Sequence, residues 1–253
     1  MIRTLLFSVL GCLSLGAVMN LHAADTRLYE LRIYHAAPGK LEALHARFRD
    51  HTRALFEKHG IVNVGYWTPI DTEDKRLIYI VSFPDRAAHD ASWKAFGADP
   101  EWQKVYKASE TDGTLVTKVE STFLSATDFS PAIEPSVAGE PRVFELRVYT
   151  TPPDKLDALQ ARFRDHTVAL FKKHGITNFG YWTPVAGAKG AGQTLIYILA
   201  HKSHEAGLEA FKNFRADPDW IKAKAESEVN GSLTIPDGVK STYLNATDYS
   251  PAR

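Results

Sequence analysis

The chain contains the same sequence pattern twice, and this duplication limits its fold more than any other feature. The segment from Glu30 to Pro69 returns 115 positions later, from Glu145 to Pro184. The match continues at offsets of 118 and then 120 positions, through ADPEW and ADPDW and through the closing segments STFLSATDFSP and STYLNATDYSP. A repeat of this length indicates one supersecondary unit built twice.

The repeat divides the chain into four parts. We expect a leader at residues 1–23, a first unit at 24–129, a linker at 130–141 and a second unit at 142–253. The linker is rich in proline and small residues, which is typical of a connection between units.

The leader has the order of a cleavable secretory signal peptide. Arg3 precedes an apolar run from Thr4 to Met19, and small residues up to Ala24 precede the polar Asp25. The single cysteine, Cys12, lies in this leader, so a mature chain cut near Ala23 has no thiol. Thiol-free chains suit oxidising compartments. We therefore expect a secreted or periplasmic protein with no membrane segment after cleavage.

Each unit shows the element order β-α-β-β-α-β. In the first unit we expect strands at 28–34, 62–67, 77–83 and 115–124, and helices at 40–60, 84–96 and from 99 onward. This order predicts an α+β protein of two tandem ferredoxin-like domains, each with both helices on one face of a four-stranded sheet. The other face would be left bare, which soluble domains rarely tolerate, so we expect two sheets to pair face to face. Pairing within the chain, as an internal pseudo-dimer, and pairing between chains, as a homo-oligomer, both remain open.

Several linked motifs resemble the NIPSNAP family, which belongs to the dimeric α/β-barrel superfamily. They are ELRIY followed by Pro38-Gly39, LFEKHGI, GYWT and DPEW, and the resemblance covers both units. It implies ferredoxin-like units whose sheets pair into a barrel. Relatives in the superfamily include cofactor-free monooxygenases, isomerases and cyclases, and haem proteins, which implies a ligand cavity between the sheets.

The composition removes several classes of function. Lys and Arg total 30 against 30 Asp and Glu, so no general charge attracts nucleic acid or anionic lipid. The sequence has no phosphate-binding loop, dinucleotide fingerprint, serine elbow or zinc-protease helix. We expect no metal and no cofactor, and a small molecule as the partner.

The first strand of each unit carries the most unusual residues. Glu30, Arg32 and Tyr34 share one strand face, and alternate with apolar residues that suit the helix-covered side. We therefore expect this trio on the barrel side, either as a buried ion pair that fixes register or as a polar cavity wall. In the second interpretation Arg holds an anionic ligand group and Glu acts as a base. The counterparts in the second unit are Glu145, Arg147 and Tyr149.

Two further sets of residues are candidates. Strand alternation also places an amide and an indole on the barrel side, as a flat ligand-binding wall or as filling between the sheets; these residues are Asn63, Trp67, Asn178 and Trp182. His51 and His166 lie beside the apolar stripe of their helices, as core residues or as acid/base groups reaching the cavity. Five histidines have no histidine counterpart in the other unit, namely His35, His45, His89, His201 and His204.

Three functions fit these observations. The first is an exported protein that binds a small hydrophobic or aromatic ligand between paired sheets. The second is a cofactor-free enzyme of monooxygenase or isomerase type, with catalytic candidates Glu30, Arg32, His51, Glu145, Arg147 and His166. The third is a non-catalytic interaction or structural module.

Overall fold

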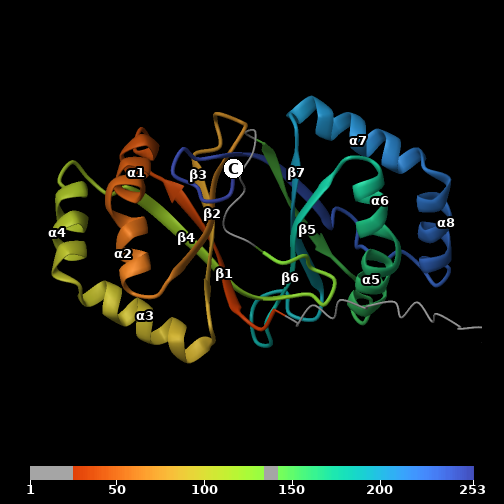
Figure 1. Ribbon diagram of the computed structural model, residues 1–253, viewed down its shortest axis with the longest axis horizontal. Helices are drawn as coiled ribbons and strands as arrows, with labels where there is room; N and C mark the ends of the chain where they lie inside the picture. Colours follow the sequence, from red (N-terminus) through yellow and green to blue (C-terminus); the bar gives the residue numbers. More distant parts are fainter. Residues whose placement is uncertain (1–24, 134–141) are drawn as a thin grey trace, which may run out of the picture.

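The computed structural model describes residues 25–133 and 142–253 as two βαββαβ units that share one barrel (Figure 1). The predicted leader and most of the predicted linker lie outside the described residues. The first unit comprises β1 (Leu28–Ala36), α1 (Leu41–Arg47), the π-helical turn η1 (Phe48–Thr52), α2 (Arg53–Lys58), β2 (Val62–Pro69), β3 (Arg76–Phe83), α3 (Arg86–Ala98), α4 (Pro100–Ser109) and β4 (Val116–Ala126). The second comprises β5 (Val143–Thr150), α5 (Leu156–Arg162), the π-helical turn η2 (Phe163–Thr167), α6 (Val168–Lys173), β6 (Thr177–Pro184), β7 (Thr194–His201), α7 (His204–Ala216), α8 (Pro218–Ser227) and β8 (Val239–Ala246).

The two sheets join edge to edge into a closed barrel. Each unit has the antiparallel order fourth-first-third-second, and the whole barrel runs β1-β3-β2-β8-β5-β7-β6-β4. At the seams Trp67 pairs with Ala246, and Trp182 pairs with Ala126. Helices α1–α4 cover one outer side and α5–α8 the opposite side (Figure 1). The predicted fold class is confirmed, and the barrel closes within a single chain.

The barrel interior is a shared apolar core. Trp67 of the first unit lies with its ring centre 5.5 Å from that of Phe144, and Trp182 of the second lies 5.7 Å from Tyr29. Leu31 and Leu146 are buried in the same cluster. The faces that each sheet leaves bare therefore bury one another, which removes apolar surface from water.

The closing motif of each unit crosses to the other unit. Tyr249 is buried among the helix-side core residues of the first unit, although it follows the last strand of the second. Ser250 Oγ accepts a hydrogen bond of 2.9 Å from the Tyr66 backbone N–H, and Ser130 Oγ accepts one of 3.0 Å from Tyr181. The repeated motif thus ties the two units together.

A β-bulge in β2 changes the side on which its residues lie. Asn63 pairs with Val81 while Gly65 pairs with Ile80, so the register shifts between them. Val64 and Trp67 consequently enter the barrel. The Trp67 ring lies over Gly65 so closely that a Cβ there would stand 2.2 Å from it.

We expect Gly65→Ala to destabilise the protein by about 1–3 kcal/mol, because the added methyl overpacks the indole. The control is Gly97→Ala in α3, where a Cβ meets no atom within 4 Å; the helix propensity of alanine predicts a gain of up to about 1 kcal/mol there. Urea denaturation measures both free energies of unfolding. Equal effects of the two substitutions would show that the indole does not require the glycine.

Within residues 25–133 and 142–253, no helix has the length and apolar character needed to cross a membrane.

Candidate functional site

The charged trio of β1 lies on the helix-covered side of the sheet, and the predicted barrel side was wrong. Glu30 is reached by the Trp93 indole of α3, whereas Tyr29 and Leu31 lie in the barrel core. Alternation separates the two sets of residues but does not say which set faces the helices. The shared core takes the apolar set, and the helix side supplies polar partners for the charges. The second unit repeats this placement for Glu145, Arg147 and Tyr149.

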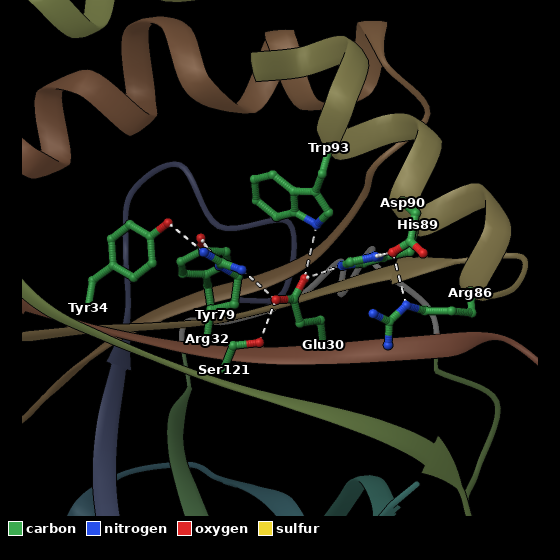
Figure 2. A network of polar contacts seen from close by, with 9 residues as sticks. All are labelled: Glu30, Arg32, Tyr34, Tyr79, Arg86, His89, Asp90, Trp93 and Ser121. Carbon is green, nitrogen blue, oxygen red and sulfur yellow. Dashed lines mark hydrogen bonds and ion pairs between the residues drawn. The ribbon is translucent and has the colours of Figure 1, made fainter. Parts of the chain in front are cut away.

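Glu30 is the centre of a polar network in the first unit (Figure 2). The carboxylate is 1% exposed. It accepts hydrogen bonds from Ser121 Oγ at 2.6 Å, from Trp93 Nε1 at 3.1 Å and from the Arg32 guanidinium. His89 Nε2 lies 3.3 Å from its second oxygen. The buried charge is therefore paired and hydrogen-bonded, as burial requires.

Arg32 connects this carboxylate to two tyrosines. Its Nε donates to Tyr79 Oη at 2.9 Å and its Nη2 to Tyr34 Oη at 3.1 Å, while the guanidinium lies 4.5 Å from the Trp93 ring centre. Burial alone would lower the pKa of Arg32, but both phenols and the carboxylate raise it, so the guanidinium stays charged. Figure 2 shows the tyrosines and the indole around it.

The second unit repeats the contacts among the glutamate, serine, arginine and tyrosines. Glu145 accepts from Ser241 Oγ at 2.5 Å and from Arg147, which in turn donates to Tyr197 at 2.9 Å and Tyr149 at 3.0 Å. Phe211 replaces the tryptophan over the guanidinium, with its ring centre 4.5 Å away.

The two units bring an imidazole to the carboxylate from different elements. In the first unit His89 comes from helix α3, and Phe83 occupies the end of β3. In the second unit His201 ends β7 and lies 3.0 Å from Glu145, and Gly207 occupies the helix position. A Cβ on Gly207 would stand 3.0 Å from the His201 ring, so only one imidazole fits. The two units thus differ at both positions, yet each has one imidazole beside its buried carboxylate.

We predict that His201→Phe costs about 1–3 kcal/mol, because the buried Glu145 oxygen loses its partner. Adding Gly207→His should recover at least half of this loss by supplying the imidazole from α7, as in the first unit. The control is His201→Phe with Gly207→Ala, which gains helix propensity but no imidazole. Urea denaturation measures the free energies of unfolding. If both double variants recover the same stability, an imidazole on α7 does not replace that of His201.

The surroundings of Glu145 lower its pKa. Burial raises the pKa of this carboxyl, but the hydrogen bonds from His201 and Ser241 and the charge of Arg147 outweigh burial. The folded pKa is therefore below the ordinary value of 4.5. The ionised carboxylate stabilises the fold above the unfolded-state pKa, and this contribution is lost as the pH falls through the folded pKa.

We expect Glu145→Gln to lower stability at pH 7 by about 3–5 kcal/mol, because Arg147 is left buried without its anion. The variant should also lose less stability than the wild type when the pH falls from about 5 to 3, since the titrating group is gone. Urea denaturation across this pH range provides the measurement. Glu209→Gln, which removes an exposed carboxylate, is the control, and a matching slope change there would contradict the assignment.

A bulge in β2 and another in β6 place the asparagine and the tryptophan of each strand on opposite faces. Asn63 faces the helices, contrary to expectation, and its amide donates to the Arg53 carbonyl at 3.2 Å. Asn178 likewise donates to the Val168 carbonyl at 3.1 Å. Trp67 and Trp182 do face the barrel, as predicted, and fill the core between the sheets. These four residues therefore do not form the predicted ligand-binding wall.

His51 and His166 are exposed on the outer side of the helices, contrary to a core position. His51 lines an open groove of about 560 Å³ with residues of α1 and α4, and His166 lines one of about 340 Å³ beside α8. Neither histidine approaches the carboxylate networks, which lie beneath the helices. The predicted catalytic roles of the candidate residues stay predictions.

A cavity of about 210 Å³ opens between the sheet and the helices of the first unit. Aromatic rings from β1, η1, α2, α3 and α4 form its walls. The rings are those of Tyr34, Phe48, Phe56, Trp93, Phe96, Trp102 and Tyr106. Tyr34 and Trp93 belong also to the Arg32 network, so the cavity and the network share a wall. Val119 of β4 lines the cavity and is 47% exposed, which places it near the opening.

The π-helical turn η1 places Phe48 and Thr52 in the cavity wall, next to Arg47 at the end of α1. Thr52 Oγ1 donates to the Arg47 carbonyl at 3.0 Å, across the wider turn. The second unit repeats this bond from Thr167 to Arg162 at 3.1 Å. Such turns occur often at functional sites.

The cavity was not predicted from the sequence, although the repeat contains a signal for it. Where the first unit has Trp93 and Tyr106, the second has Phe211 and Lys224. The units therefore differ in the rings that line the cavity. Comparing the copies for differences, in addition to shared residues, would have marked the positions of these rings and of the exchanged histidines.

Among residues 25–133 and 142–253, no three His, Cys, Asp or Glu side chains are grouped so as to hold a metal ion.

Comparisons with known proteins agree with this architecture. The family model NIPSNAP matches residues 29–131 and again residues 144–251. A search of curated proteins finds no match. An uncharacterised NIPSNAP domain protein from Burkholderia xenovorans is 22% identical over 41% of this chain and 98% of its own, with a TM-score of 0.37.

Two other solved structures cover both units. An anthrone oxidase-like protein is 12% identical, with a TM-score of 0.61 over 90% of this chain and 94% of its own. A candidate monooxygenase from Lactobacillus acidophilus is also 12% identical, with a TM-score of 0.57 over 90% of this chain and 98% of its own. These similarities show a common fold.

Proposed function

The chain belongs to the NIPSNAP family, and on that premise we propose that its first unit binds a small planar aromatic molecule in the cavity between sheet and helices. The observation that carries the proposal is the aromatic wall around a space of about 210 Å³. An apolar cavity of about 150 Å³ is enough to bind benzene, so one or two fused rings fit here. Flat rings pack edge or face against such walls.

The proposed site differs from the expected position between the paired sheets. The barrel interior holds the packed core that includes Trp67, Trp182 and Phe144. The helix side instead offers a space next to a fixed charge, with the Tyr34 hydroxyl held by Arg32 at 3.1 Å. Apolar walls with a few fixed polar groups are typical of ligand sites.

The position of the Tyr34 hydroxyl also supports a second proposed function, that of a cofactor-free enzyme. The phenol lines the cavity and accepts a hydrogen bond from a charged guanidinium. A group in this position can exchange a proton with a bound ligand, and the neighbouring Arg32 would stabilise negative charge that develops on that ligand. The names of the two structural neighbours, one for anthrone oxidase and one for monooxygenase, agree with this second proposal.

We further propose that the protein works outside the cytoplasm. The order of charge, apolar run and small residues in the leader supports export. N-terminal sequencing of the mature protein would test it by locating the cut.

If the cavity binds the ligand, two matched substitutions should affect binding differently. Val119→Trp should place an indole in the cavity and weaken binding of the probe 1-methylnaphthalene at least tenfold. Val239→Trp is the control, because Val239 is the counterpart of Val119 in the second unit and is 44% exposed against 47%; it should bind as the wild type does. Isothermal titration calorimetry gives the affinities.

Two outcomes would refute the binding site. One is the absence of saturable binding by the wild type, and the other is equal loss in both tryptophan variants. Mass spectrometry of ligands that co-purify with the wild type, before and after incubation in air, tests the enzymatic alternative: a ligand that stays unchanged argues for binding alone.

A further inference from the structure

Tyr106 of helix α4 is the residue at which the cavity of the first unit differs in charge from the same place in the second unit. Its ring lines the cavity and is 48% exposed, so it lies at the opening. The ring centre lies 5.7 Å from that of Trp102 and 5.4 Å from the guanidinium carbon of Arg47. The matching residue of helix α8 is Lys224, so an uncharged ring in one unit corresponds to an ammonium group in the other.

The charged side chains that line the cavity neutralise each other. Of the described residues in the wall, Arg47 and Glu110 are charged, and Arg47 Nη1 lies 2.8 Å from Glu110 Oε1. The arginine side chain is 5% exposed and the glutamate side chain 17%, so a ligand meets more of the carboxylate than of the guanidinium. An anion in the cavity would therefore be repelled in a partly buried space, where water screens charge weakly.

The second unit places an additional cation beside the equivalent carboxylate. Lys224 Nζ lies 3.9 Å from Glu228 Oε2, and Glu228 Oε1 accepts a hydrogen bond of 2.8 Å from Arg162. Two cations thus accompany one carboxylate in the second unit, whereas in the first unit a phenol ring occupies the place of the lysine. A lysine in place of Tyr106 would make the net charge around the carboxylate positive.

We propose that Tyr106 determines the charge specificity of the cavity, which accepts uncharged aromatic molecules and rejects aromatic carboxylates. This inference rests on the proposed function, because it assigns the charge class of the molecule in the same cavity. The phenol ring offers a flat apolar face to the ligand and adds no cation. A lysine at this position would attract a carboxylate and offset its repulsion by Glu110.

Two probes of the same shape and different charge test this specificity by isothermal titration calorimetry. 1-Naphthamide is neutral, and 1-naphthoate carries a carboxylate at the same ring position. We expect the wild type to bind the amide about tenfold more tightly than the acid at neutral pH, because Glu110 repels the anion. 1-Methylnaphthalene, measured beside them, reports whether the cavity binds aromatic rings at all.

Tyr106→Lys should lower the affinity ratio of amide to acid about tenfold, because the ammonium group attracts the carboxylate. Lysine occupies the equivalent place on α8, so the variant should fold. Tyr106→Gln removes the ring without adding charge, and should weaken both probes while keeping the preference for the amide. Ala225→Lys adds the same charge at an exposed position of α8, on the opposite side of the molecule from α4 (Figure 1), and should leave the ratio unchanged.

The outcomes separate this inference from the proposed function. If 1-methylnaphthalene binds the wild type but the amide and the acid do not differ, or the acid binds best, the aromatic cavity stands and the charge specificity is wrong. An equal fall of the ratio in Tyr106→Lys and in either control variant also overturns the role of Tyr106. If none of the three probes binds, the proposed function fails as well.

A second variant covers the case in which Tyr106→Lys does not fold. Val119→Lys brings the same charge to the opening from β4, because Val119 lines the cavity and is exposed. A lowered ratio in that variant supports the inference, and an unchanged ratio overturns it.

Discussion

The burial of one sheet against the other is the constraint on which the rest of the structure depends. Each unit has helices on only one face of its sheet, and the second face must find a cover. The two units supply it for each other, with Trp67 packed against Phe144 and Trp182 against Tyr29. Because the barrel interior is taken by apolar side chains, the charged residues in the middle of β1 and β5 lie on the helix side.

The helix side of each sheet therefore holds the buried polar networks. Glu30 is buried and Arg32 partly buried beneath helix α3, and tyrosine, serine and tryptophan side chains hydrogen-bond to them. Both units also keep an imidazole beside the carboxylate, although His89 comes from a helix and His201 from a strand. The contact has been kept while its source has changed, which indicates that the contact itself matters.

The two units differ beside this common network. The first unit surrounds its cavity with Trp93 and Tyr106, whereas the second has Phe211 and Lys224 at these positions. In the proposed function the first copy binds the ligand, and the second completes the barrel and contributes its closing segment, including Tyr249, to the core of the first unit. A duplicated chain allows this division, since the two copies can change independently.

The sequence alone determined the repeat, the element order and the need for two sheets to pair, because periodicity and duplication are properties of local sequence. It also marked Glu30, Arg32 and Trp67 as unusual. It could not decide which face of a strand meets the helices, since alternation is symmetric. The bulge in β2 placed Asn63 and Val64 on the faces opposite to those predicted. The cavity depends on side chains brought together from β1, η1, α3 and α4, and only their packing in three dimensions decides whether space is left between them.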